Sequence, residues 1–344
     1  MCTSFVYQTK GEDLFLSRTM DFGFTLDAKP VALPRGYTFE SDVDGERYSG
    51  KYALIGAGRN LGKYALIGAG RNLGKYILAD GVNEHGLACA SLYLPSEAVY
   101  SKNTEAGKTN LAPHEFLLWA LSFCKDVSEL REVLQTIHLV DQKVDLLGIT
   151  TPLHWIFYDK LGNVAVIEPT DPSFKLTLKE NPVGVMTNTP SLEWHFKNLT
   201  NYIDITPEQK TSAKFGKFEA HPFSQGGGTL GLPGGYTPPE RFVRAAYLKE
   251  HIQEANNEQE GVTNVWYVLK SVTIPKGAVI KSDGTPDLTQ YTSSMCVSSL
   301  TYYFTPYGNQ RITGCKLDDD FINHSQTPYE WDVLQTEDIL YKER

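Results

Sequence analysis

The sequence predicts an α+β fold in which two mostly antiparallel sheets pack against each other with helices on the outside. Three observations lead to this prediction: two β-prone runs near the start, a helical region over 111–138, and several β-prone runs after residue 152. With 344 residues the chain can bury a large core, and sandwich folds of this size also occur as one unit. We therefore expect a single domain over residues 1–344.

The first predicted element is a β-hairpin at the N-terminus. Residues 5–7 and 14–16 are short apolar runs of β-prone side chains, and the polar residues 9–13 between them are typical of a turn. Such a hairpin would return the residues that follow position 16 to the neighbourhood of the chain start. The side chains at both ends of the hairpin are therefore candidates for one site.

Cys2 is the candidate nucleophile of that site. Removal of Met1 would place a thiol and a free α-amine on one residue, and because an α-amine titrates near about 8, it can take the proton of a thiol. Arg18 could hold the sulfur as a thiolate, and Asp21 could accept a hydrogen bond from the α-amine. The ordinary alternatives are a small residue after an initiator Met and a solvated surface ion pair.

The segments 1–4 (Met-Cys-Thr-Ser) and 17–22 (Ser-Arg-Thr-Met-Asp-Phe) resemble the start of the choloylglycine hydrolase family, which comprises penicillin V acylases and bile salt hydrolases. The resemblance extends over essentially the whole chain. It implies an N-terminal-nucleophile amidohydrolase with an αββα four-layer sandwich and a small-molecule acyl amide as substrate. This chemistry requires no cofactor, and we expect no metal site. The resemblance also implies a homo-oligomer, because family members are often homotetramers.

The composition argues against several classes of partner. A net charge of −9 does not suit a surface for nucleic acid or anionic membranes. No run reaches the roughly 20 apolar residues of a membrane span, and no signal peptide is recognised, so we expect a cytoplasmic protein. The five cysteines are odd in number and widely spaced, which fits neither a disulfide framework nor a zinc site. The four besides the candidate nucleophile are expected to be buried fillers: Cys89, Cys124, Cys296 and Cys315.

Residues 50–61 are repeated without change at 62–73. Two copies are too few for a solenoid, and the glycines lack the third Gly and the acidic residue of a dinucleotide-binding loop. Because the family resemblance implies one copy of this strand, we expect 62–73 to be a surplus insertion, extruded as a loop.

A turn is predicted at 80–87 and a buried strand at 88–94. The segment resembles the family's Asp-Gly-Val-Asn-Glu-x-Gly-Leu motif. This resemblance places Tyr93 at an oxyanion-hole position that is Asn in most bile salt hydrolases and Tyr in penicillin V acylases. Its backbone N–H would be the donor.

The central part of the chain predicts two helices followed by a meander. Apolar residues recur at helical spacing over 111–138, and Asp126 with Glu129 is expected to cap the second helix. His114 and His138 flank this region without metal-ligand spacing, so we expect both to be structural. The strand-like runs lie at 153–158, 164–168 and 174–178.

Two later segments also resemble the family. Residues 184–190 (Gly-Val-Met-Thr-Asn-Thr-Pro) place Asn188 as the second oxyanion donor, although an Asn before Thr-Pro is also a turn former. Pro238 or Pro239 is expected to open a helix in which Arg241 matches the family's active-site arginine. Arg244, one turn later, is expected to be a surface or interface charge. Further expectations are a helix at 263–272, closing strands at 291–296 and 301–304, and surface charges at 318–320.

The predicted reaction is hydrolysis of a linear amide through a thioester on Cys2. Tyr93, with segments 223–226 and 238–242, is more similar to the penicillin V acylase side of the family, so phenoxyacetyl amides are the expected substrates. Conjugated bile salts are the first alternative, and N-acyl homoserine lactones are another. The alternative outside enzymes is an inactive binding protein that retains Met1 or is disrupted by the duplication.

Overall fold

The computed structural model describes residues 1–23, 25–60, 75–145 and 147–343. Within these residues, the sheet that contains the N-terminus has the strand order β14-β1-β2-β18-β19-β20, with β17 beside β18. Neighbouring strands in it are antiparallel. The strands are β1 (Cys2–Gln8), β2 (Leu14–Phe22), β14 (Val185–Met186), β17 (Val279–Ile280), β18 (Pro286–Cys296), β19 (Thr301–Pro306) and β20 (Thr313–Lys316).

The second large sheet has the order β13-β12-β11-β8-β7-β6-β3-β21 and is also antiparallel throughout. Its strands are β3 (Lys29–Leu33), β6 (Leu54–Asn60), β7 (Tyr76–Asn83), β8 (Ala88–Tyr93), β11 (Leu153–Tyr158), β12 (Val164–Ile167), β13 (Leu178–Glu180) and β21 (Tyr329–Glu330). Smaller pairs are formed by β4 (Thr38–Glu40) with β5 (Arg47–Ser49), and by β9 (Thr109–Leu111) with β10 (Ile137–Leu139).

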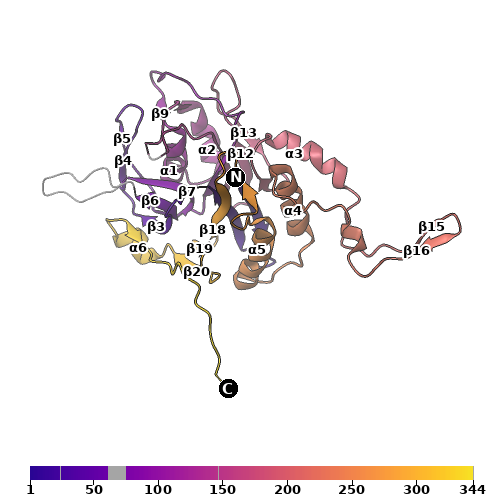
Figure 1. The fold of residues 1–344 in the computed structure, drawn as a ribbon. Helices are drawn as coiled ribbons and strands as arrows, with labels where there is room; N and C mark the ends of the chain where they lie inside the picture. Colours follow the sequence, from indigo (N-terminus) through magenta and orange to yellow (C-terminus); the bar gives the residue numbers. More distant parts are fainter. Residues whose placement is uncertain (24, 61–74, 146, 344) are drawn as a thin grey trace.

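Helices cover the outer face of each sheet, which gives the four layers of the predicted αββα sandwich (Figure 1). Helix α1 packs on β7, β8 and β11, whereas α4 and α5 pack on β1 and its neighbours; β1 and β2 in turn contact β8 of the other sheet. The helices are α1 (Pro113–Phe123), α2 (Val127–Val133), α3 (Leu192–Leu199), α4 (Pro238–His251), α5 (Glu258–Val272) and α6 (Asp319–His324).

Alternation of side chains along β11 explains how one strand serves two cores. Ile156 and Tyr158 belong to the core that includes residues of both sheets, while Trp155 and Phe157 belong to the core beneath α1. The ring of Phe116 on α1 meets Trp155 edge to face, with centroids 4.7 Å apart. A strand buried on both faces has an unbroken apolar run in its sequence, and residues 153–158 show this pattern.

Most predicted elements are confirmed. The hairpin forms between β1 and β2, Asp126 accepts a hydrogen bond from the Glu129 N–H at 2.8 Å as the cap of α2, and α4 begins at Pro238. The four cysteines expected to be fillers are buried.

Three boundaries differ from the prediction. The turn expected at 80–87 is shorter, because β7 continues through Asn83 and only the following residues turn. The strand expected at 174–178 begins only at Leu178, since Phe174 has a φ of 61°, outside the extended region. Helix α5 begins at Glu258 rather than at 263, so Glu258 and Glu260 lie in its first turn.

The first copy of the repeat forms β6, and the last register pair of β6 with β7 joins Asn60 to Tyr76. The second copy, 62–73, lies outside the described residues, so its expected extrusion stays a prediction.

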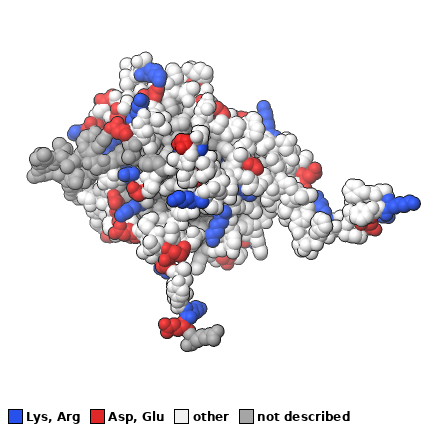
Figure 2. Space-filling view, in the orientation of Figure 1, with Lys and Arg blue, Asp and Glu red and all other residues white. Residues whose placement is uncertain are grey.

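A two-stranded hairpin of β15 (Ala213–Phe215) and β16 (Phe218–Ala220) projects from the body beyond α3 (Figure 1). On the face drawn in Figure 2, basic and acidic side chains are interspersed. Among the described helices, none has the length and apolar character needed to cross a membrane.

Candidate active site

The β1–β2 register places Arg18 and Met20 on the face of β2 that lies beside Cys2. Cys2 pairs with Met20, and Arg18 lies two residues earlier on the same face. Arg18 Nη2 donates a hydrogen bond to Cys2 Sγ at 3.0 Å and to Met20 Sδ at 2.8 Å. Both Cys2 and Arg18 are buried. The sequence-predicted pairing of a thiol with a cation is therefore present in the structure.

Residues from three other strands surround the far side of the Arg18 guanidinium. Its Nη1 lies 3.3 Å from Asp80 Oδ2 on β7, and this carboxylate also accepts hydrogen bonds from the hydroxyls of Tyr291 and Tyr302. Burial alone would lower the pKa of Arg18, but the attraction of Cys2, Tyr291, Asp80 and Tyr302 outweighs it and raises that pKa above its ordinary value. Arg18 is thus a permanent cation in contact with the sulfur.

On the other side of Cys2, two side chains bind its main chain. The Cys2 N–H donates to Asn188 Oδ1 at 2.8 Å, and Arg241 Nη2 donates to the same oxygen at 2.8 Å. Arg241 Nη1 donates to the Cys2 carbonyl at 2.6 Å. Asn188 Nδ2 donates to the Tyr93 carbonyl at 2.8 Å, so two donors on Oδ1 and an acceptor at Nδ2 define the orientation of this amide. An amide nitrogen has a second N–H, which could serve an oxyanion.

Asp21 lies in the same buried cluster but makes different contacts from those expected. Its carboxylate accepts hydrogen bonds from Thr19 Oγ1 at 3.0 Å and Thr289 Oγ1 at 2.5 Å, and it lies 3.9 Å from Arg241 Nη1. Burial raises the pKa of Asp21, although Arg241, the N-terminal ammonium and the two hydroxyls oppose the rise.

The expected hydrogen bond from the Cys2 nitrogen to the Asp21 carboxylate is not made within the described residues. With Met1 in place the Cys2 nitrogen is a peptide N–H, and it donates to Asn188 instead. The ammonium group of Met1 donates to the Asp21 backbone carbonyl at 2.8 Å and lies 3.5 Å from Asp287 Oδ2. With Met1 present, the structure therefore has no free α-amine on Cys2.

Tyr93 is the last residue of β8, and both its backbone and its ring lie at the site. The ring packs edge to face on Phe22, with centroids 5.4 Å apart. Burial, and next the nearby Cys2, raise the pKa of its phenol. Its carbonyl, rather than its N–H, faces the Asn188 amide. The predicted donor role of the Tyr93 N–H stays a prediction.

A cavity opens beside Cys2, and mainly apolar side chains line it. Met20, Phe22, Val144 and Leu147 are among these residues, and the empty volume, open mouth included, is about 830 Å³. A thiol at the wall of an apolar cavity can receive the carbonyl of a bound acyl group.

Three residues that line the cavity each have a buried polar atom without a hydrogen-bond partner in the described part of the chain. These atoms are the Tyr93 hydroxyl, His114 Nδ1 and Thr151 Oγ1. His114 was expected to be structural, and its other nitrogen does bind Asp42 Oδ2 at 3.0 Å, yet the residue also lines the cavity. Buried polar atoms without partners are unusual, and these three have almost no accessible surface.

Sequence reasoning missed Asp80, Tyr291 and Tyr302. The available signal was a single acidic residue within a segment that borders a buried strand, since buried carboxylates need partners. It also misplaced Arg244, which was expected to be a surface or interface charge. Arg244 is buried, because its guanidinium donates to the carbonyls of Ser271, Pro233 and Gly235.

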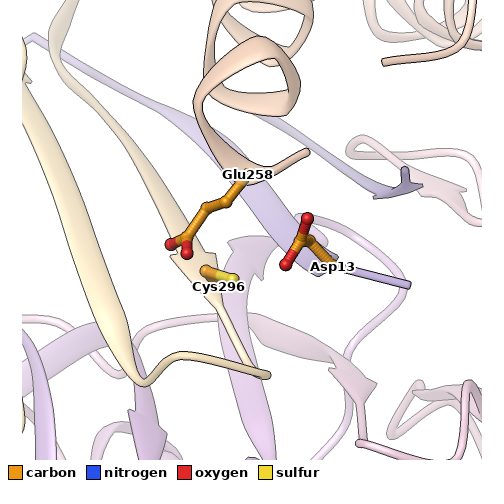
Figure 3. Close-up of side chains that lie close together, drawn as sticks. All are labelled: Asp13, Glu258 and Cys296. Carbon is orange, nitrogen blue, oxygen red and sulfur yellow. The ribbon is translucent and has the colours of Figure 1, made fainter. Parts of the chain in front are cut away.

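Among the described residues, two groups of side chains have a spacing that metal ions could use, and the chemistry of both argues against a metal site. Figure 3 shows Asp13, Glu258 and Cys296 brought together from separate segments. Burial raises the pKa of Cys296 to about 11, which favours the neutral thiol over the thiolate that metals bind. In the second group, Asp42, His114 and Glu115, the cation is Lys75, whose Nζ lies 2.7 Å from Asp42 and 2.9 Å from Glu115.

Comparison with known proteins gives consistent results. A family model described as "Linear amide C-N hydrolases, choloylglycine hydrolase family" matches residues 2–329. The bile salt hydrolase/transferase of Clostridium perfringens is 31% identical over 95% of each chain.

The crystal structure of variant R18L of conjugated bile acid hydrolase from C. perfringens has a TM-score of 0.88 at 29% identity, covering 99% of this chain and all of that one. Penicillin V acylase from Agrobacterium tumefaciens has a TM-score of 0.73 at 21% identity, covering 96% of this chain and 90% of that one, and so shows a shared fold.

Proposed function

The chain belongs to the choloylglycine hydrolase family of linear amide C–N hydrolases, and we propose that it cleaves the amide bond of conjugated bile salts. The observation that supports this proposal most is the contact of Arg18 with Cys2 Sγ at 3.0 Å, at the wall of an apolar cavity. This arrangement offers an activated thiol to a bound acyl group.

Two observations favour bile salts over penicillin V. The C. perfringens relative that is 31% identical over nearly the whole chain is named a bile salt hydrolase/transferase, whereas the likeness to the A. tumefaciens penicillin V acylase extends to the fold. The cavity is lined mainly by apolar side chains, which suits the apolar acyl group of a bile salt. The preference for penicillin V inferred from Tyr93 is thus the less well supported of the two alternatives.

In the proposed mechanism, removal of Met1 first frees the α-amine of Cys2. The amine takes the thiol proton, and the thiolate attacks the amide carbonyl carbon. As the tetrahedral intermediate collapses, the C–N bond breaks and the leaving amine takes that proton. Water then gives a proton to the α-amine and attacks the thioester, which releases the carboxylic acid and restores the thiol.

The remaining residues set charge and position in this scheme. The second N–H of Asn188 and the backbone N–H of Tyr93 would bind the oxyanion, and such a donor contributes about 3–4 kcal/mol. Arg18 would stabilise the thiolate, while Arg241 would hold the Cys2 carbonyl and the Asn188 amide. Asp21 would orient the α-amine once Met1 is absent.

The proposal includes a homo-oligomer, as the family resemblance implies. Phe215 and Phe218 on the projecting hairpin are 69% and 68% exposed, and an isolated two-stranded hairpin is marginally stable in water. A second copy of the chain would cover these rings. Light scattering should give a multiple of the 38.4 kDa chain mass, and the double variant Phe215→Ser, Phe218→Ser should lower it. A monomer in the unsubstituted protein would refute this part.

The test of substrate class is amine release from glycocholate and from penicillin V, measured side by side with Cys2→Ala as the control. Intact mass must first show that Met1 is removed. We expect faster turnover of glycocholate and none in the variant. Preference for penicillin V would restore the expectation from Tyr93. If protein that lacks Met1 released amine from neither substrate, another acyl amide or an inactive binding protein would be favoured.

A further inference from the structure

Two buried histidines bind consecutive carbonyls in the segment that presents Asn188. His154 Nε2, on β11, lies 2.9 Å from the Thr187 carbonyl. His195 Nε2, on α3, lies 3.0 Å from the Asn188 carbonyl and 3.3 Å from Thr187 Oγ1. Both rings are almost fully buried, at 1% and 2% exposure. The peptide units on both sides of the Asn188 Cα are therefore held by the two imidazole rings.

Glu168 connects the two histidines. Its Oε1 lies 3.3 Å from His154 Nδ1 and accepts the Leu192 N–H at 3.0 Å, at the start of the helix that contains His195. Its Oε2 lies 2.8 Å from Lys179 Nζ. Burial alone would raise the pKa of Glu168, but His154 and Lys179 outweigh that effect and lower it. A carboxylate thus orients one histidine directly and the other through helix α3.

The surroundings of His195 favour one protonation state. Its Nδ1 is buried and has no partner among the described residues, and its ring stacks on Phe242 at 4.6 Å and 8°. Burial lowers its pKa, and the nearby His154 acts in the same direction, while the Asn188 carbonyl and Glu168 oppose the shift. The neutral ring has one N–H, and only the Nε2–H tautomer can donate it to the Asn188 carbonyl.

We propose that His195, with Glu168 and His154 behind it, is a positioning residue that fixes the Asn188 amide against Cys2 for oxyanion binding. This inference rests on the proposed function. Asn188 Oδ1 receives the Cys2 N–H and Arg241, and its Nδ2 donates to Tyr93, so a shift of its backbone would disturb all three contacts. Displacements of about 1 Å in such groups can lower rates by 10²-fold.

The test compares His195→Gln with His195→Leu in the full-length protein. The amide of Gln can place an N–H near the position of Nε2, whereas Leu cannot. We expect kcat on glycocholate to fall by about 10- to 100-fold in the Leu variant, with KM little changed, and to recover most of the loss in the Gln variant. His324→Leu, at an exposed position on α6, is the matched control and should leave kcat unchanged.

Two further measurements keep the inference open to refutation. In case His195→Leu fails to fold, Glu168→Gln keeps the side-chain shape and should lower kcat less than the Leu variant, again at similar KM. Nitrogen-15 NMR of labelled histidine should show His195 as the neutral Nε2–H tautomer at pH 7, with its signals assigned by their loss in the Gln variant.

The outcomes separate this inference from the proposed function. Equal losses in folded Leu and Gln variants, an unchanged kcat in both, or an Nδ1–H tautomer would overturn the positioning role while hydrolysis stands. A wild-type protein that lacks Met1 and turns over no amide would overturn the proposed function, and the inference with it.

Discussion

Two fully buried arginines lie on opposite sides of Cys2, and their surroundings shift their pKa values in opposite directions. Arg18 contacts the sulfur, and nearby acidic and phenolic groups raise its pKa. Arg241 contacts the Cys2 carbonyl, and burial lowers its pKa, although Asp21 and Cys2 oppose the change. The thiol side of the site is therefore organised by charge, and the main-chain side by hydrogen-bond geometry.

The difference follows from the partners that each arginine has. Arg18 lies 3.3 Å from Asp80, a carboxylate held by two tyrosine hydroxyls. Arg241 lies 3.9 Å from Asp21, whose pKa is raised. Removing Arg18 should thus change the reactivity of the Cys2 thiol. Removing Arg241 should change only the positions of the reacting groups.

The largest effect is expected for Arg18→Leu. Loss of the preorganised cation at the sulfur should lower kcat/KM by about 10²-fold or more, and slow the alkylation of Cys2 by iodoacetamide. Asp80 would be left buried without its cation, so urea unfolding should show a loss of about 3–5 kcal/mol. An unchanged alkylation rate in folded protein would remove the distinction between the two arginines.

Arg241→Met should have the next largest effect. Because Arg241 binds the Cys2 carbonyl and Asn188 rather than the sulfur, kcat should fall by about 10- to 100-fold while the rate of Cys2 alkylation by iodoacetamide stays the same. The exposed Arg47→Met is the matched control and should leave both unchanged. Slower alkylation in Arg241→Met would show that charge also governs this side.

Tyr302→Phe tests a residue that supports Arg18 indirectly, through Asp80. The hydroxyl of Tyr302 donates to Asp80, so its loss should lower the free energy of unfolding by about 1–3 kcal/mol, as measured in urea, and affect kcat/KM less than Arg18→Leu. Tyr329→Phe, at an exposed position, serves as the control. If both substitutions had the same effect, the buried contact with Asp80 would not contribute to stability.

Deletion of residues 62–73 is expected to have the smallest effect. The deletion joins β6 to β7, the strand that holds Asp80 on the thiol side, and β6 already pairs with β7 as far as Asn60 and Tyr76. Turnover and melting temperature should stay the same or improve. A collapse of either would mean that the second copy contributes to the fold.

How much the sequence could predict depended on the distance along the chain. The pairing of Cys2 with Arg18 spans 16 residues and follows from local β-alternation, so the sequence could predict it. Asn188 and Arg241 were placed by family resemblance, and the structure brings both to Cys2.

Contacts between distant strands were not predictable in the same way. Tyr291 and Tyr302 reach Asp80 across 211 and 222 residues, and nothing in their local sequence marks them as partners. Arg244 was misplaced for a related reason, since its acceptors are backbone carbonyls, which every segment has. The contact of Asp21 with Thr289 likewise depends on how β18 pairs with β2.

The central claim is that Cys2 forms a thioester with the acyl group, and trapping that intermediate tests it most directly. Protein that lacks Met1 would be mixed with glycocholate, quenched in acid within seconds, and measured by intact mass and peptide mapping. We predict a cholyl adduct on Cys2, and neither adduct nor glycine release in Cys2→Ala. Glycine release by Cys2→Ala at the wild-type rate, or an adduct on another residue, would contradict the account.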